Sequence, residues 1–115
     1  MNLVRWAEMA EEQLNPLISR KVMNSSNMTL AKLTLREGAH VAKHSHVNEQ
    51  ITMLEQGVLR FVTPDGEYIL RAGESMCIPP HLPHSVDALE DSVALDIFAP
   101  VREDWLRGDD AYLRK

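Results

Sequence analysis

The sequence predicts an all-β protein, a small sandwich or barrel of short strands, with helical pattern only near its two ends. Two observations carry this prediction. Apolar residues recur with a period of two along most of the chain, and turn residues such as Gly, Pro and Asp-Gly close each run. Many short strands at regular spacing are typical of sandwiches and barrels. A length of 115 residues and an apolar content of 44% fit a single domain, residues 1–115.

Seven runs are expected to be strands because they are rich in strand-forming residues and alternate at least in part. They are residues 17–24, 28–36, 50–55, 58–63, 67–71, 75–78 and 92–98. The run from Thr63 to Glu67 contains Pro and Asp-Gly and predicts a tight hairpin turn. Helical pattern is confined to residues 6–14, a short helix or covering segment, and to residues 101–106.

Composition argues against several partners. The formal net charge is −5 and the 12 basic residues are scattered, whereas nucleic-acid binding requires a clustered basic surface. No apolar run reaches signal-peptide length or the roughly 20 residues of a membrane span, so we expect a cytoplasmic protein without a membrane partner. Cys77 is the only cysteine; it fits a reducing compartment and is expected to be a small buried residue on a strand.

All five histidines fall in two short segments, a clustering that is typical of a metal site. They are His40, His44 and His46, and then His81 and His84. Residues two apart on an extended strand point to the same face, so His44 and His46 are expected to converge on one ion. Gln50 has the same parity and joins them if the strand continues with at most a local bend. A histidine from the second segment would complete the set.

Glu49 competes with Gln50 as the oxygen ligand. Its carboxylate is the better donor, but its opposite parity should point it away from the histidines, so we favour Gln50. Neutral imidazoles suit Zn, Ni, Fe, Mn or Co, and a neutral amide leaves the ion more of its charge. Such a site should favour an anionic substrate and Lewis-acid chemistry. His40 and His81 are expected on the pocket rim or the surface.

Two interpretations of Asp96 remain open. The alternate positions Val93, Leu95 and Ile97 form an apolar face, so a half-buried strand would expose Asp96 to water. If a dimer partner or the N-terminal segment covers that face, Asp96 and Phe98 line the barrel instead. Burial of a carboxylate is unfavourable unless it is paired or functional. The two-sided apolar pattern and the short chain predict a homodimer.

Two spaced motifs resemble those of the cupin family. The first runs from Gly38 through five residues to His44-x-His46, then through three residues to Gln50 and six residues to Gly57. Gln stands where most cupins have Glu.

The second motif runs from Gly73 through five residues to Pro79, with His84 five positions later. His81 occupies a position where this motif usually has Gly. Together the motifs span about half the chain. The resemblance implies a cupin fold, a double-stranded β-helix or jelly-roll barrel with short terminal helical segments. It also implies one divalent metal ion, held near the barrel mouth by three His and one oxygen ligand.

The segment His44–Gln50, followed by Leu95–Leu106, is similar to the family of small cupins named for the pectin-degradation protein KdgF. Those enzymes convert 4,5-unsaturated monouronates, released by pectin and alginate lyases, to linear 5-keto sugars. The resemblance implies as metal ligands His44, His46, Gln50 and His84, and as pocket residues Asp96, Phe98 and Arg102.

On this interpretation the protein is a metal-dependent lyase or isomerase that opens a uronate ring and ketonises the product. Asp96 is then the candidate proton shuttle, Arg102 the candidate anchor for the substrate carboxylate, and Phe98 a wall of the pocket. A cupin dioxygenase acting on a small organic substrate is the first alternative. A cupin that binds a sugar or effector without turnover is the second, because fold alone does not specify chemistry.

Overall fold

The computed structural model describes residues 1–115 as ten strands, one 3-10 helix and two short α-helices. The elements are η1 (Trp6–Glu8), β1 (Glu12–Asn15), β2 (Ile18–Asn24), β3 (Thr29–Leu35), β4 (His40–His44), β5 (Glu49–Gln56), β6 (Val58–Thr63), β7 (Gly66–Arg71), β8 (Ser75–Ile78), β9 (His84–Ala88), β10 (Ser92–Ala99), α1 (Glu103–Leu106) and α2 (Ala111–Arg114). The predicted all-β fold is confirmed.

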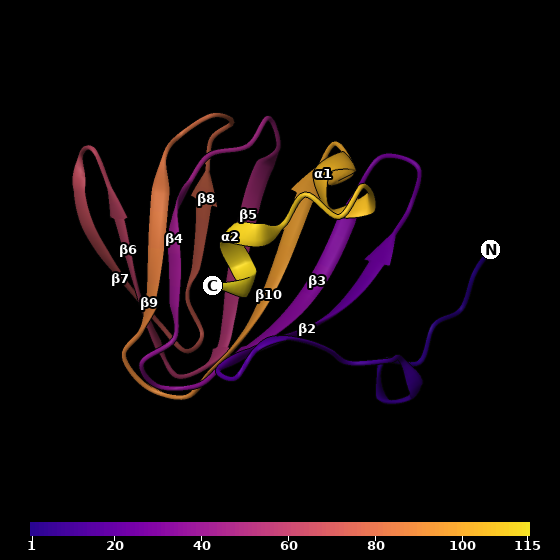
Figure 1. Cartoon of the computed structure of the whole chain (residues 1–115), viewed down its shortest axis with the longest axis horizontal. Coiled ribbons are helices and arrows are strands. Elements are labelled where there is room, and N and C mark those ends of the chain that lie inside the picture. The colour runs from indigo at the N-terminus through magenta and orange to yellow at the C-terminus, as the bar shows by residue number, and fades with distance from the viewer.

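The strands form two antiparallel sheets. The larger has six strands in the order β1-β2-β3-β10-β5-β8, and the smaller has four in the order β4-β9-β6-β7. Figure 1 shows the smaller sheet on the left, the larger sheet extending to the right, and α1 and α2 lying across the strands in front. No helix is long and apolar enough to cross a membrane.

The core lies between the sheets because inward positions alternate along the central strands. On β5 the buried residues are Gln50, Thr52 and Leu54, and their neighbours are exposed. The apolar part of the core comprises 17 buried residues from both sheets and α2. The inward face of β5 therefore changes from apolar at Leu54 to polar at Gln50, and the polar end forms part of the candidate site.

Each of the seven predicted strands is present, with bounds within one residue of those expected. The predicted hairpin joins β6 to β7, where Thr63 pairs with Gly66. Gly57 is the single residue between β5 and β6. Its φ is +90, and a Cβ there would lie 2.2 Å from Ser92 Oγ. Only glycine therefore allows this turn to approach the start of β10 so closely.

Three strands and one helix were not expected from the sequence: β1, β4, β9 and α2. The helix considered for residues 6–14 is largely wrong, because only η1 forms there and β1 begins at Glu12 to pair with β2. Cys77 was expected to be buried but is exposed. On β8 it is Ile78 that faces the core, so Cys77 faces outward.

Candidate metal centre

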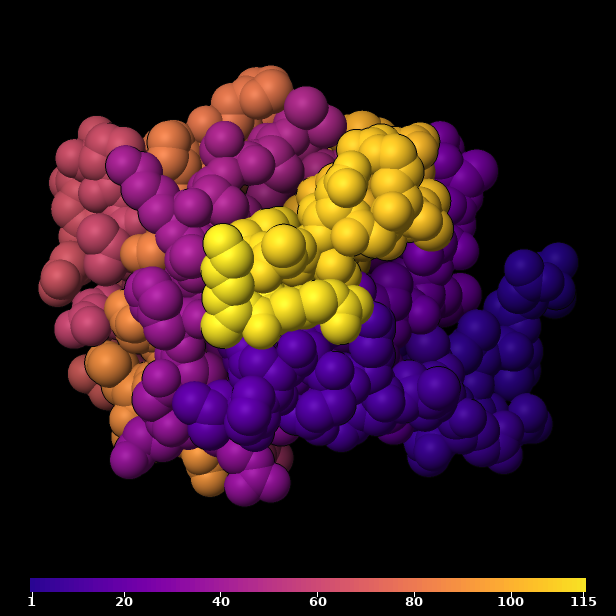
Figure 2. Space-filling model, in the orientation of Figure 1, coloured from indigo at the N-terminus to yellow at the C-terminus, as the bar shows by residue number.

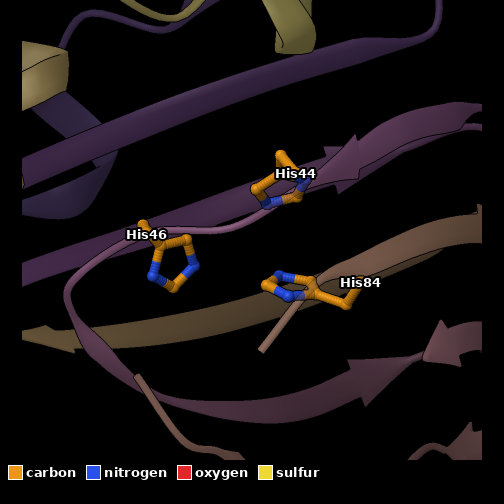
Figure 3. Close-up of side chains that lie close together, drawn as sticks. All are labelled: His44, His46 and His84. Carbon is orange, nitrogen blue, oxygen red and sulfur yellow. The ribbon is translucent and has the colours of Figure 1, made fainter. Parts of the chain in front are cut away.

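Three histidines converge at one end of the barrel. His44 ends β4, His84 begins β9 on the neighbouring strand, and His46 lies in the loop that leads to β5. One nitrogen of each ring lies within 4.8 Å of the others, and the ring centroids of His44 and His84 are 4.3 Å apart. Figure 3 shows the three rings turned toward a common space. This arrangement can hold a metal ion.

Backbone carbonyls fix the tautomer of all three rings. Each Nδ1 contacts a carbonyl oxygen, which only accepts hydrogen bonds, so Nδ1 carries the proton and Nε2 keeps its lone pair. The carbonyls are those of Ala42 for His44 at 2.8 Å, Asn48 for His46 at 3.0 Å and Leu82 for His84 at 2.8 Å. The three Nε2 atoms are therefore oriented as metal ligands.

Burial also keeps the three rings neutral. It lowers the pKa of His44 and of His46 to about 4, with smaller contributions from the neighbouring imidazoles and from Arg102. Burial likewise lowers the pKa of His84. Near neutral pH the rings need not lose a proton before they bind a cation.

The expectation that His44, His46 and Gln50 share one face of a single strand is wrong. β4 ends at His44 in the smaller sheet, and β5 begins at Glu49 in the larger sheet. The residues still converge because the connecting loop is held in place. The His46 carbonyl accepts a hydrogen bond from the His81 N–H at 2.8 Å, and the Asn48 side chain donates to Pro100 O.

Gln50 is buried and turned toward the histidines, whereas Glu49 is exposed. Gln50 Oε1 lies 3.1 Å from His46 Nε2. The Gln50 amide nitrogen donates to Thr52 Oγ1 at 2.8 Å, and the Thr52 hydroxyl donates to Asp96 Oδ1 at 2.7 Å. Because an ionised carboxylate only accepts, this chain directs the amide oxygen of Gln50 toward His46.

The contact between Gln50 and His46 indicates that the site suits a cation. His46 Nδ1 carries the ring proton, so Nε2 and the amide oxygen are both acceptors, and they lie 3.1 Å apart. Two acceptors repel at this distance unless a cation lies between them. Three imidazole nitrogens and one amide oxygen match the preferences of Zn, Ni, Fe, Mn and Co.

Asp96 faces the barrel interior, in the same cavity as His44 and His84. The cavity has a volume of about 50 Å³, and its lining includes His44, His84, Gln50, Asp96 and Phe98. Burial raises the pKa of Asp96 to about 6, although the hydrogen bond from Thr52 and the charge of Arg102 act in the opposite direction. Asp96 was expected either to face water or to line the barrel, and the structure shows that it lines the pocket.

Arg102 lies beside the same cavity but is not a free cation. Its side chain is 1% exposed, and its Nε and Nη2 donate to the two oxygens of Asp104 at 3.0 and 2.8 Å. Nη2 also donates to the Tyr112 hydroxyl at 2.6 Å. The guanidinium carbon lies 4.6 Å from the centre of the Phe98 ring and 4.4 Å from that of Trp105. These contacts fix the cation at the wall of the cavity.

The remaining histidines lie away from this centre. His40 is exposed, and its Nδ1 contacts Asp87 Oδ1 at 2.7 Å. The His81 side chain is exposed in the turn before β9. Thr52 was not among the expected site residues, although its parity with Gln50 places it on the inward face. Tyr112 was not expected either, because it has no periodic signal in the sequence.

Comparisons with known proteins agree with this architecture. A model of the cupin domain matches residues 31–98. No curated protein sequence matches the chain. Among solved structures, KdgF from Halomonas sp. is 26% identical with a TM-score of 0.83 over 90% of this chain and 99% of that chain.

Other similar structures are more distant in sequence. A RmlC-like cupin from Shewanella frigidimarina is 22% identical with a TM-score of 0.84, over 91% of this chain and 96% of that chain. Oxalate decarboxylase from Bacillus subtilis, a protein with Mn(II) centres, is 20% identical with a TM-score of 0.71, over 87% of this chain and 31% of that chain. The domain model covers more than half of the sequence, and the chain belongs to the cupin family.

Proposed function

We propose that the protein is a metal-dependent enzyme that converts 4,5-unsaturated monouronates to linear 5-keto-4-deoxyuronates by ring opening and ketonisation. One observation carries the proposal: a carboxyl group with a pKa of about 6, Asp96, lines the same cavity as His44 and His84, two of the three histidines that can hold a metal. The likeness to KdgF from Halomonas sp. over 90% of the chain supports this choice of substrate.

The reaction needs a group that takes up one proton and returns it. In a 4,5-unsaturated uronate the ring oxygen belongs to an enol ether. Removal of the proton from the anomeric hydroxyl and cleavage of the C1–O5 bond leave an enolate at C5, and protonation at C4 then gives the ketone. No electrons are gained or lost. Asp96 suits both transfers because its pKa lies near neutral pH, so that both protonation states are accessible.

The other pocket residues orient the substrate. His44, His46, His84 and Gln50 would hold the metal, which when bound supplies Lewis-acid stabilisation of negative charge on oxygen. Arg102 presents a fixed positive charge beside the cavity, suited to the substrate carboxylate. Phe98 forms part of the wall between Arg102 and His46.

Incubation with an unsaturated monouronate tests the proposal by the loss of its conjugated ultraviolet absorbance, with analysis of the product. We expect turnover by the metal-loaded protein both in air and under anaerobic conditions, because the reaction is an isomerisation. A requirement for oxygen would favour the dioxygenase alternative. Binding of the uronate without loss of absorbance would favour a non-catalytic cupin.

We also propose that two copies pack through the outer face of the larger sheet. An apolar row crosses five paired strands there, and its members are Met23, Leu30, Ile97, Ile51 and Cys77. Ile51 is 43% exposed, and Met53 beside it is 42% exposed. A two-fold axis would bring such a row against its own copy and remove it from water.

A further inference from the structure

Tyr112 joins the metal centre to the pocket wall from outside both sheets. Its ring stacks on His44, with the centroids 4.3 Å apart and an angle of 24° between the planes. Its hydroxyl accepts hydrogen bonds from Arg102 Nη2 at 2.6 Å and from Trp105 Nε1 at 3.1 Å. Tyr112 lies on α2, which Figure 1 shows in front of the strands. One side chain thus contacts both a candidate metal ligand and the fixed cation.

The cavity behind Tyr112 is too small for a sugar acid. Its volume of about 50 Å³ takes only a few water molecules, since one water needs about 10–15 Å³. A monouronate has about a dozen non-hydrogen atoms, and pockets that bind small organic molecules are typically about 300–1,000 Å³. Part of the lining must therefore move before such a substrate can enter this cavity and reach His44 and His84.

The segment that carries Tyr112 differs from most of the lining because no backbone ladder of a sheet holds it. Most lining residues lie on strands held by backbone ladders, whereas Tyr112 and Leu113 lie on a helix of four residues outside both sheets. Gly108 precedes this segment with φ +81, and nothing lies within 4 Å of the position of a Cβ. Gly108 thus gives the chain between α1 and α2 a backbone conformation that other residues rarely adopt.

Side-chain contacts hold this segment closed. Figure 2 shows the yellow residues filling the space between the magenta and the indigo parts of the chain. Asp110 contacts Arg20 of β2 and Arg114, and Arg114 also contacts Glu12 of β1. The Asn15 side chain donates to the Leu113 carbonyl at 3.1 Å. The Arg114 side chain is 40% exposed, so its ion pairs contribute little to stability and weaken with salt. The Arg20–Asp110 pair is buried, and it is the contact that must break for the cover to open.

We propose that Tyr112 is a further positioning residue of this site, carried on a cover of residues 108–115 that opens to admit the substrate and, when closed, fixes Arg102 and shields His44. The need for opening rests on the proposed function, because it follows from the size of a uronate. The shielding of His44 follows from the stacking contact alone and is tested without substrate.

The test without substrate uses diethyl pyrocarbonate, which acylates neutral imidazoles, on the metal-free full-length chain, with each histidine followed by mass spectrometry. Tyr112→Ala should speed the modification of His44 severalfold, and Tyr112→Phe should leave it near the wild-type rate because the stacked ring remains. The exposed His40 provides a reference within the same molecule. An unchanged His44 rate in Tyr112→Ala would overturn the proposal.

A second groove offers an alternative route by which a reagent could reach the histidines. It has a volume of about 270 Å³ and is lined by residues that include Tyr68, Leu82 and His84. If access runs through that groove, Tyr68→Ala and not Tyr112→Ala will speed histidine modification, which refutes the cover. Should Tyr112→Ala fail to fold, Arg114→Ala loosens the cover from outside the pocket and should still speed His44 modification. An unchanged rate in that variant would count against the proposal.

The unsaturated monouronate tests the positioning role separately. Tyr112→Phe keeps the ring but removes the oxygen that accepts from Arg102 Nη2. We expect a higher KM with kcat little changed and with the His44 modification rate unaltered, a combination that a general loss of structure would not produce. A wild-type KM in Tyr112→Phe would refute the positioning role. If the wild-type protein does not turn over the uronate, the proposed function fails, while the modification experiment still decides the cover.

Discussion

Asp96→Asn should make the protein more stable near neutral pH while it abolishes turnover. Burial raises the pKa of Asp96 from an ordinary 3.8 to about 6. Between about pH 4 and 6 the folded protein therefore binds more protons at this residue than the unfolded chain does, and this contribution to the free energy of unfolding falls as pH rises. Above pH 6 Asp96 is ionised in both states, and the full cost of ionising it inside the folded protein lowers the free energy of unfolding. At 1.36 kcal/mol per pKa unit, it is about 3 kcal/mol.

The difference between the two proteins isolates this effect from other titrating groups. The neutral histidines act in the opposite direction, since their lowered pKa values favour the fold increasingly as pH rises from about 4 to 6.5. Asparagine keeps the size of aspartate and can still accept the hydrogen bond from Thr52. Urea unfolding of both metal-free proteins at several pH values should show similar stabilities near pH 4. The variant should be more stable, by up to about 3 kcal/mol, at pH 7.

Activity is the second half of the same prediction. Asparagine cannot take up and return a proton near neutral pH, so kcat on the unsaturated monouronate should fall by at least about a hundredfold. Metal content should be unchanged, because Asp96 is not one of the proposed ligands and asparagine can still accept the hydrogen bond from Thr52, which in turn accepts from Gln50. A variant that is no more stable than wild type at pH 7 would refute the buried, ionised carboxylate. A variant with wild-type kcat would refute the proton shuttle.

Three further predictions concern the ligands and the assembly. The His44→Ala, His46→Ala double variant should lose its metal by elemental analysis, whereas Glu49→Ala should keep a full complement because Glu49 is exposed; metal retained by the double variant would exclude the centre. Thr52→Val should lower metal affinity in chelator competition by about 10- to 100-fold, since it removes the hydroxyl that orients the amide ligand, and unchanged affinity would refute that role. Sedimentation should show a dimer that Ile51→Lys disrupts; a folded wild-type monomer at micromolar concentration would exclude it.

The sequence predicted those parts of the fold that local pattern determines. Alternation and turn residues located seven strands, because burial between two sheets imposes a period of two wherever a strand is long enough to show it. β4 and β9 were not predicted because each has five residues with few strong strand formers. They are stabilised by pairing with each other, which no local pattern shows. α2 has four residues, and its position depends on contacts with β1 and β2 that no local pattern reveals.

The candidate site shows the same division between local and long-range information. Parity correctly separated the buried Gln50 from the exposed Glu49, since both lie at the start of β5. The same argument failed for His44 and His46, because the chain passes from one sheet to the other between His44 and Gln50. Spacing indicated a candidate metal site, and the structure brings its three histidines together. The tautomers depend on backbone carbonyls, and the stacking of Tyr112 on His44 depends on a distant segment, so only the structure reveals them.

The charge balance of the pocket predicts that an organic anion binds only when the metal site is loaded. Near pH 7 the three histidines and the Gln50 amide are neutral, and the charge of Arg102 is opposed by Asp104 at 2.8 Å. Asp96 is mostly ionised because its pKa is about 6. The metal-free lining is therefore negative by about one charge, and a divalent cation reverses its sign. Calorimetric titration with saturated galacturonate, which has the carboxylate but no enol ether, should show binding to the metal-loaded protein and none to the metal-free protein. Equal affinity for the two forms would mean that Arg102, and not the cation, holds the anion.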